Sequence, residues 1–209
     1  MDTTPYVYII EDDDAVRDSL HMMLESVDQQ VKVFTCADTF LESYKKDMAG
    51  CIVLDIRMPG MNGMELQRKL NELNVILPII FVTGHGDVPM AVEAMQHGAF
   101  DFVQKPYREQ ELLEKISQAI ELDEENRSSL QEQQLILKNI DTLTPREIDV
   151  MRLMVEGKAN KVIAIDLDIS QRTVEIHRAR VMEKVNANSL AHLVRMYMAV
   201  EKDLTAESA

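Results

Sequence analysis

The chain has 209 residues and a formal net charge of −14 at pH 7, and 46% of its residues are hydrophobic. This length allows two modest domains, each with its own core. The longest apolar runs span about half a dozen residues, far fewer than the roughly 20 that cross a bilayer, so we expect no membrane segment and a cytoplasmic location. The two cysteines cannot form a disulfide framework, and no CxxC pattern indicates a zinc site.

The negative charge is concentrated in the N-terminal part of the chain. Residues 1–121 contain 10 Lys and Arg against 21 Asp and Glu, whereas residues 141–209 contain 10 against 11. The acidic part is therefore a poor candidate for binding nucleic acid, but the nearly neutral part can still present a local basic stripe to phosphates. We expect the two parts to have different partners.

Strand-like apolar runs and helix-like segments alternate through the first 122 residues. The expected strands are Tyr6–Ile10, Val31–Phe34, Cys51–Leu54, Pro78–Val82 and Phe100–Gln104, and the expected helices are Asp14–Val27, Cys36–Met48, Gly63–Leu73, Asp87–His97 and Glu109–Leu122. This alternation predicts an α/β domain over residues 1–122, with a doubly wound parallel sheet that helices cover on both faces.

Chemically useful side chains follow four of these strands. Glu11 and Asp12 follow the first, Asp55 the third, Thr83 the fourth and Lys105 the fifth. We expect them in one crevice, because ligands of open α/β sheets bind outside the carboxyl ends of the strands. Three carboxylates repel one another unless a cation lies among them, and Mg²⁺ prefers such oxygen ligands. Asp55 could then attack a phosphoryl donor, while Thr83 and Lys105 bind the phosphoryl oxygens.

These acids allow two other interpretations. Any single one could be an ordinary loop or helix-cap residue, but the combination favours a phosphoryl site. The rival enzyme interpretation is a phosphatase with an aspartyl-phosphate intermediate, which commonly has a second carboxylate two residues after the nucleophile. That position is Arg57 here, so slow self-hydrolysis is favoured over turnover of an external substrate.

The C-terminal part has a different pattern. Residues 123–140 begin with acids and serines and become glutamine-rich, and we interpret them as a linker that continues the preceding helix. Residues 141–209 are expected to be an all-α domain of short helices. Thr144-Pro145-Arg146-Glu147 has the features of a helix start, and Ser189–Val200 forms the last helix. Between them, Asn160–Leu167 and a basic helix from Ser170 to about Val185 indicate a helix-turn-helix, although a solvated helix of a four-helix bundle is the alternative.

Motifs at the strand ends resemble the receiver domain of two-component response regulators. They are Glu11-Asp12-Asp13, Leu54–Gly63, Val82-Thr83-Gly84 and Lys105-Pro106. The resemblance implies a flavodoxin-like (βα)5 fold, a sensor histidine kinase as partner, and Mg²⁺ as cofactor. By this resemblance the phosphoacceptor is Asp55, the metal site is Glu11 (through water), Asp12, Asp55 and the backbone carbonyl of Arg57, and the phosphoryl-binding or switch residues are Thr83, Phe102, Lys105 and Pro106. Glu11 departs from the more usual Asp at its position.

Motifs of the C-terminal part resemble the LuxR-type helix-turn-helix. They are Leu143–Glu147, Asn160–Ala164 and Ser170–Arg178, and their pairing with a receiver that contains Gly84–Val92 is similar to the FixJ group of transcriptional regulators. The resemblance implies that Glu175, Ile176 and Ala179 face base edges, and that Lys161, Arg172, Thr173, His177, Arg180 and Lys184 contact phosphates or support the helix.

Together the two resemblances imply a phosphorylation-controlled transcription regulator. It would dimerise through about residues 87–122 and bind a two-fold site on double-stranded DNA, and RNA polymerase is a further candidate partner. Two alternatives stay open at this point: a phosphotransfer-only signalling module, and a phosphorylation-independent DNA-binding regulator with a vestigial receiver.

Overall fold

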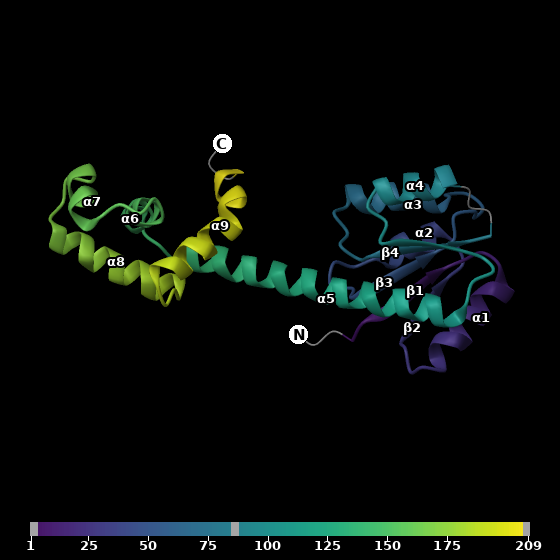
Figure 1. The fold of residues 1–209 in the computed structure, drawn as a ribbon. Helices are drawn as coiled ribbons and strands as arrows, with labels where there is room; N and C mark the ends of the chain where they lie inside the picture. Colours follow the sequence, from purple (N-terminus) through teal and green to yellow (C-terminus); the bar gives the residue numbers. More distant parts are fainter. Residues whose placement is uncertain (1–3, 85–87, 207–209) are drawn as a thin grey trace. The chain divides into compact units, whose positions relative to one another are not determined.

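The computed structural model describes residues 4–84 and 88–206, and strands and helices alternate through its first part as the sequence predicts (Figure 1). Its elements are β1 (Tyr6–Ile10), α1 (Asp14–Glu25), β2 (Val31–Phe34), α2 (Ala37–Ser43), β3 (Gly50–Leu54), α3 (Gly63–Glu72), β4 (Ile79–Thr83), α4 (Val88–Gln96), β5 (Asp101–Gln104), α5 (Glu109–Ile140), α6 (Pro145–Val155), α7 (Asn160–Asp166), α8 (Gln171–Val185) and α9 (Leu190–Ala206). The chain divides into two compact units, Met1–Arg127 and Ser128–Ala209, and the division falls within α5.

The first unit contains a parallel sheet of strand order β2-β1-β3-β4-β5. Helices α1 and α5 cover one face, and α2, α3 and α4 cover the other (Figure 1). This is the flavodoxin-like, doubly wound arrangement that the sequence predicts. Strand order changes direction between β1 and β3, so the carboxyl ends of these two neighbours border the crevice where such folds bind ligands.

Alternation of side chains along the strands produces two hydrophobic cores. Val7 and Ile9 of β1 belong to the core under α1 and α5, whereas Tyr8 and Ile10 belong to the core under α2, α3 and α4. Every residue of β3 is buried, as expected for a strand that is covered on both faces. The central strands are therefore held by packing on both faces. This packing also restricts the movement of the loops attached to the strand ends.

Several element bounds differ from the expected ones. Helix α2 ends at Ser43 rather than Met48, because Tyr44 adopts an extended backbone (ψ 135°) and packs against the core instead of continuing the helix. Asp87, with which the fourth helix was expected to begin, lies outside the described residues. Helix α9 continues past Val200 to Ala206. In contrast, residues 123–140 are part of α5, as expected for a linker that continues the preceding helix.

The second unit is entirely helical within residues 128–206, with a core of apolar side chains from the end of α5 and from α6, α7, α8 and α9. The predicted start of α6 is confirmed as a capping box: the Thr144 hydroxyl accepts from the Glu147 amide, and the Glu147 carboxylate accepts from the Thr144 amide. Ser170 caps α8 by accepting from the Thr173 amide at 3.0 Å. Over the part of the chain that is described, no helix has the length and apolar character needed to cross a bilayer.

Candidate functional site

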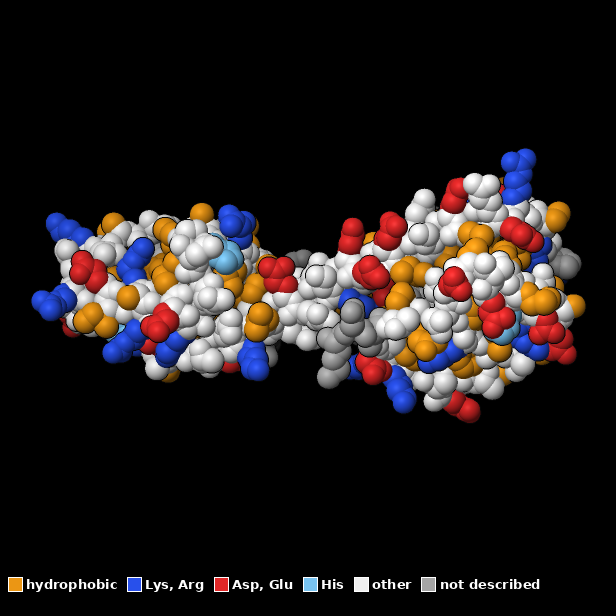
Figure 2. Space-filling view, turned by 90° about the horizontal axis from the view of Figure 1, so that it is seen from below, with side chains coloured by type: hydrophobic (Ala, Val, Ile, Leu, Met, Phe, Trp, Pro, Cys, Tyr) orange, Lys and Arg blue, Asp and Glu red, His pale blue; other side chains and the backbone are white. Residues whose placement is uncertain are grey.

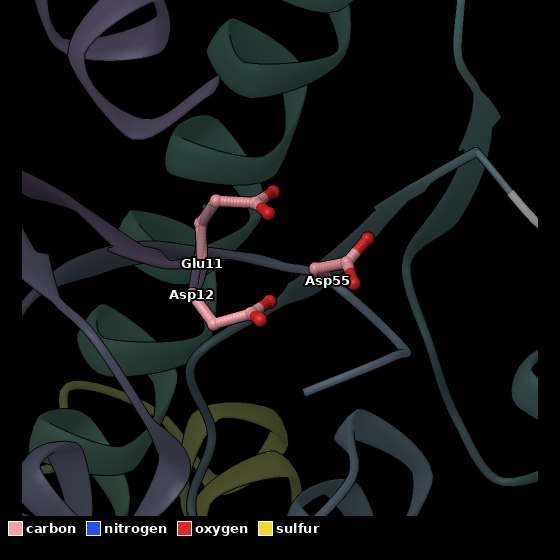
Figure 3. A group of neighbouring side chains, drawn as sticks. All are labelled: Glu11, Asp12 and Asp55. Carbon is pink, nitrogen blue, oxygen red and sulfur yellow. The ribbon is translucent and has the colours of Figure 1, made fainter. Parts of the chain in front are cut away.

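The carboxyl ends of β1 and β3 bring three carboxylates together (Figure 3). Oxygens of Glu11, Asp12 and Asp55 lie within 4.8 Å of one another. Glu11 is 3% exposed and Asp55 7% exposed, while Asp12 is exposed to solvent. The crevice therefore has two buried acids at its base and one acid at its mouth, so a ligand from solvent meets Asp12 first.

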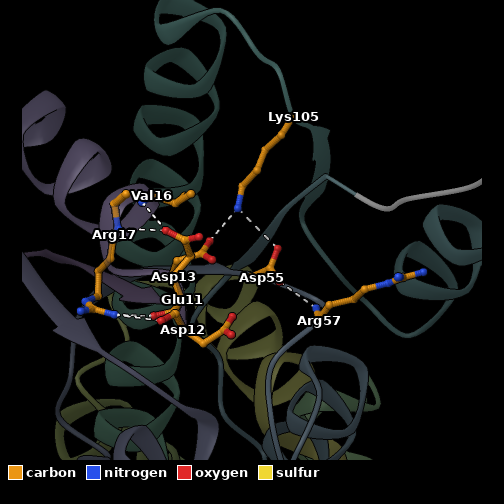
Figure 4. A network of polar contacts seen from close by, with 9 residues as sticks. Glu11, Asp12, Asp13, Val16, Arg17, Asp55, Arg57 and Lys105 are labelled. Carbon is orange, nitrogen blue, oxygen red and sulfur yellow. Dashed lines mark hydrogen bonds and ion pairs between the residues drawn. The ribbon is translucent and has the colours of Figure 1, made fainter.

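Lys105 supplies the positive charge of this crevice (Figure 4). Its Nζ lies 2.7 Å from Glu11 Oε2 and 3.5 Å from Asp55 Oδ1. The Lys105 amide donates to the Thr83 carbonyl at 2.9 Å, which ties the end of β5 to β4, and the Lys105–Pro106 peptide bond is cis. Burial raises the pKa of the Glu11 carboxyl above its usual range, and the hydrogen bond from Lys105 opposes that rise.

Asp55 is held from two sides. Its Oδ2 accepts a hydrogen bond of 2.8 Å from the Arg57 amide, while Oδ1 faces the Lys105 ammonium. The loop that follows can return close to Asp55 because Gly63 begins α3 there: a Cβ at Gly63 would lie 2.4 Å from the Asp55 carbonyl oxygen. The Asp55 carboxylate is thus held in a fixed orientation by the Arg57 amide and the Lys105 ammonium.

The remaining predicted switch residues lie on β4, β5 and the following loop. Thr83 is 1% exposed at the end of β4, beside the strand that leads to Asp55. Phe102 is partly buried and packs against the same core as Met90 of α4, whereas Pro106 is exposed. Their assigned roles, like the backbone carbonyl of Arg57 as a metal ligand, stay predictions.

The acidic crevice has the chemistry that a hard divalent cation requires. Its three carboxylates offer oxygen ligands within one small volume, and one of them faces solvent, where a hydrated ion can arrive. Lys105 already compensates part of the negative charge at Glu11 and Asp55. The site is therefore suited to a metal ion.

The second candidate site is the exposed side of α8. Arg172, Glu175, Ile176, Ala179 and Arg180 are all exposed, and Ile176 is 47% exposed although it is apolar. The apolar residues Val174, Val181 and Val185 lie on the opposite side and are fully buried in the core. On the face that Figure 2 shows, lysine and arginine side chains gather over the C-terminal unit and acidic side chains over the N-terminal one. The exposed side of α8 can therefore enter a DNA groove.

Three residues that the sequence assigned to DNA contact have partners or burial within the fold. Lys184 Nζ lies 2.6 Å from Glu147 Oε2 and also donates to the Thr142 carbonyl. The Thr173 hydroxyl hydrogen-bonds the Ser170 hydroxyl at 2.8 Å. His177 is partly buried, and within the described part of the chain its Nδ1 has no hydrogen-bond partner. Of the two roles expected for Lys184, the contacts favour support of the helix.

Comparison with known protein families identifies both parts of the chain. Residues 7–117 match the response regulator receiver domain, and residues 141–197 match the luxR family of bacterial regulatory proteins. The chain belongs to the response regulators. With its LuxR-type domain, this response regulator is a regulator of transcription rather than a conventional enzyme, and the acidic crevice lies in its receiver domain.

Similar proteins cover nearly the whole length of this response regulator. The transcriptional regulatory protein FixJ of Bradyrhizobium diazoefficiens is 44% identical over 198 residues, which are 95% of this chain and 97% of FixJ. FixJ of Rhizobium meliloti is 46% identical over 193 residues, or 92% of this chain and 95% of that protein. Among solved structures, that of the response regulator StyR is similar with a TM-score of 0.83 and 44% identity, covering 96% of this chain and 100% of StyR.

One polar residue beside the crevice was not predicted from the sequence. Arg17 on α1 donates from Nη1 to the backbone carbonyl oxygens of Glu11 (3.0 Å) and Asp12 (3.5 Å) (Figure 4). Its other terminal nitrogen pairs with Asp14. The spacing of Asp14 and Arg17 is a detectable signal, because residues three apart are neighbours on a helix. The two carbonyl contacts have no comparable signal in the sequence of the response regulator.

Proposed function

We propose that Asp55 accepts a phosphoryl group from a partner histidine kinase with Mg²⁺ bound, and that this modification promotes dimerisation and sequence-specific binding to double-stranded DNA. A receiver implies a kinase partner, and a LuxR-type helix-turn-helix implies DNA. The observation that carries the proposal is the convergence of Glu11, Asp12 and Asp55 with the Lys105 ammonium between two of them.

Each residue of the crevice has a defined part in phosphorylation. Asp12 and Asp55 are the proposed direct ligands of Mg²⁺, Glu11 acts through water, and the Arg57 carbonyl completes the set. Bound Mg²⁺ would neutralise charge and allow an anionic phosphoryl donor to approach. The Arg57 amide orients the Asp55 carboxylate, and Lys105 is within reach to pair with a phosphoryl oxygen in place of its present partner Glu11.

The response to phosphorylation involves the side of the receiver that carries α4, β5 and α5. Thr83 would bind a phosphoryl oxygen, and Phe102, which packs against the same core as Met90 of α4, would change its packing. We infer that residues of about 87–122 then form the dimer surface. When two helix-turn-helix units are linked in a dimer, binding of the first to a two-fold DNA site raises the effective concentration of the second. Dimerisation alone therefore raises the occupancy of the DNA site.

Among the DNA contacts, Glu175, Ile176 and Ala179 are the proposed base readers. Ile176 suits a thymine methyl group, and Glu175 can accept from a cytosine amino group. Arg172, Arg180 and Lys161 are exposed and are the proposed phosphate contacts. The second candidate function is a phosphorylation-independent regulator with a vestigial receiver, and a phosphotransfer-only module is the third.

One experiment separates these functions. DNA fragments are first selected by the full chain from a random pool, and affinity is then measured with and without acetyl phosphate and Mg²⁺. We expect a gain in affinity for the native chain and none for Asp55→Asn, while Asp18→Asn, an exposed acid on α1, serves as the matched control. Equal affinity in all samples would support the vestigial receiver, and absence of selected DNA would support the phosphotransfer module.

A further inference from the structure

We propose that Arg17 is a positioning residue for the metal-binding acids, an inference that rests on the proposed function of the crevice. Besides the ion pair between the Glu11 side chain and Lys105, three contacts hold the loop that carries Glu11 and Asp12. The Glu11 amide donates to the Phe34 carbonyl of β2, the Glu11 carbonyl accepts from Arg17, and the Asp13 carboxylate caps α1. Of these three contacts, the one made by Arg17 reaches the backbone carbonyl oxygens of both Glu11 and Asp12.

The negative charge of the loop explains why a positioning residue is needed there. Glu11, Asp12, Asp13 and Asp14 are consecutive acids, and like charges at this separation repel one another and favour a loop that opens. The Arg17 side chain is only 12% exposed, so its guanidinium lies against the backbone and is not free in solvent. Groups that orient metal ligands typically change metal affinity by about 10–100-fold when they are removed.

The test compares Arg17→Gln and Arg17→Lys with the native full chain. Amide shifts around residues 12 and 55 in NMR titrations with Mg²⁺ give the dissociation constant of the metal alone. We expect Arg17→Gln to weaken Mg²⁺ binding by about tenfold and Arg17→Lys, which keeps a charged donor, to restore part of it. Arg68→Gln is the matched control, because Arg68 is a half-exposed arginine that pairs with Glu93 away from the crevice.

A second readout separates positioning from general damage to the fold. The rate of phosphorylation by acetyl phosphate should return to the native value in Arg17→Gln once Mg²⁺ is saturating. An unchanged dissociation constant, or a rate that stays low at saturating Mg²⁺, would overturn the inference. If the native chain itself neither responds to Mg²⁺ nor becomes phosphorylated at Asp55, the proposed function fails instead.

At the opposite end of the sheet, a buried acid of α5 contacts the start of β3. Asp123 of α5 is fully buried, and its Oδ2 accepts from the Gly50 amide at 2.8 Å and from Arg127 Nε at 2.7 Å. Arg127 also donates to the Met48 carbonyl. We call these contacts of Asp123 and Arg127 with residues 48–50 the α5 clasp.

The clasp connects two functional parts of the chain. Gly50 begins β3, and Asp55 directly follows the last residue of that strand, so the strand that presents the phosphoacceptor is bound to α5 at its other end. Gly50 fits because a Cβ there would lie 1.9 Å from the Tyr6 carbonyl oxygen. Apolar residues of similar volume would often stabilise such a site at least as well as a buried ion pair, so the pair is better explained by a need to fix position.

We infer that the clasp anchors the start of the linker segment, residues 123–140, and thereby makes DNA binding responsive to the receiver. Asp123 and Arg127 are four residues apart and therefore lie on the same side of α5. Without the clasp, the receiver would retain its crevice, but the following turns of α5 would lose their attachment to β3. The coupling part of this inference rests on the proposed function, whereas the anchoring part does not.

The test uses Asp123→Asn and Arg127→Gln in the full chain, with Glu125→Gln as the matched control because Glu125 is an exposed acid on the same helix. We expect hydrogen exchange of amides in residues 123–135 to accelerate by tenfold or more in both variants, in step with each other, and the phosphorylation rate of Asp55 to stay native. The gain in DNA affinity on phosphorylation should shrink. Native exchange rates would overturn the anchoring, and a native gain in affinity with accelerated exchange would overturn the coupling. If phosphorylation does not raise the DNA affinity of the native chain, the result counts against the proposed function alone.

Discussion

The pair of Lys184 and Glu147 gives a prediction that decides the role of a lysine at the DNA-binding unit. Glu147 is 2% exposed, accepts from Lys184 Nζ at 2.6 Å and closes the capping box of α6. These bonds lower the pKa of Glu147 from its ordinary 4.5 to about 2, with the Lys184 hydrogen bond as the largest cause. At about 1.4 kcal/mol for each tenfold change in proton affinity, the difference is worth about 3 kcal/mol of stability.

Removal of Glu147 and removal of Lys184 should lower the free energy of unfolding by different amounts. Glu147→Ala should lower the free energy of unfolding of this unit by about 2–3 kcal/mol, because both the ion pair and half of the capping box are lost. Lys184→Met should cost about 1–2 kcal/mol, since its ammonium is partly exposed and solvent screens it in part. Native-state hydrogen exchange of α6 and α8 amides in the full chain measures both values.

The pH dependence has a definite sign. A carboxyl whose folded pKa is lowered contributes fully above its unfolded pKa and loses that contribution as the pH falls through the folded value. The difference in stability between the native chain and Glu147→Ala should therefore be constant above about pH 5 and narrow between 4.5 and about 2. A difference that grows on acidification would refute the assignment.

DNA-binding measurements test the alternative role of Lys184, a contact with DNA phosphate. If Lys184 only supports α8, Lys184→Met leaves the slope of log affinity against log salt unchanged, whereas Lys161→Met, the exposed control on α7, lowers it by about 0.9. Native stability of Lys184→Met together with a slope lower by about 0.9 would show that Lys184 is a phosphate contact and would refute its role as a support of α8.

Three further predictions follow from the two sites and the sheet. Asp12→Asn should raise the stability of the receiver by about 1 kcal/mol in urea without Mg²⁺, because it removes one of three repelling carboxylates; a decrease would contradict this. Gly50→Ala should cost roughly 3 kcal/mol or more in thermal melts, because of the clash with Tyr6 and a φ of 118°; native melting would contradict it. Arg172→Ala and Arg180→Ala should each weaken DNA binding and lower the salt slope by about 0.9, and an unchanged slope would exclude that residue as a phosphate contact.

Strand ends could be predicted from the sequence because two local signals combine there. An apolar run identifies a buried strand, and the next residues must lie at the sheet edge, so Asp55 and Lys105 could be assigned to one crevice before any contact was known. The capping box of Thr144 and Glu147 was equally accessible, since its signal spans only four residues.

Side-chain partners across long sequence separations could not be predicted in the same way. Asp123 contacts Gly50 across 73 residues, and Lys184 contacts Glu147 across 37. Nothing in the local pattern of Lys184 distinguishes a lysine that faces phosphate from one that faces a buried acid. Such choices depend on packing, which periodicity does not encode.

Helix α5 has a consequence for how the chain unfolds. Its first half places Leu112 and Ile116 in the core of the first unit, and its last turns place Ile136 and Ile140 in the core of the second. One hydrogen-bonded helix thus belongs to two hydrophobic cores, and fraying that starts in either core removes helical structure that the other uses. The two units are therefore expected to melt with partial cooperativity.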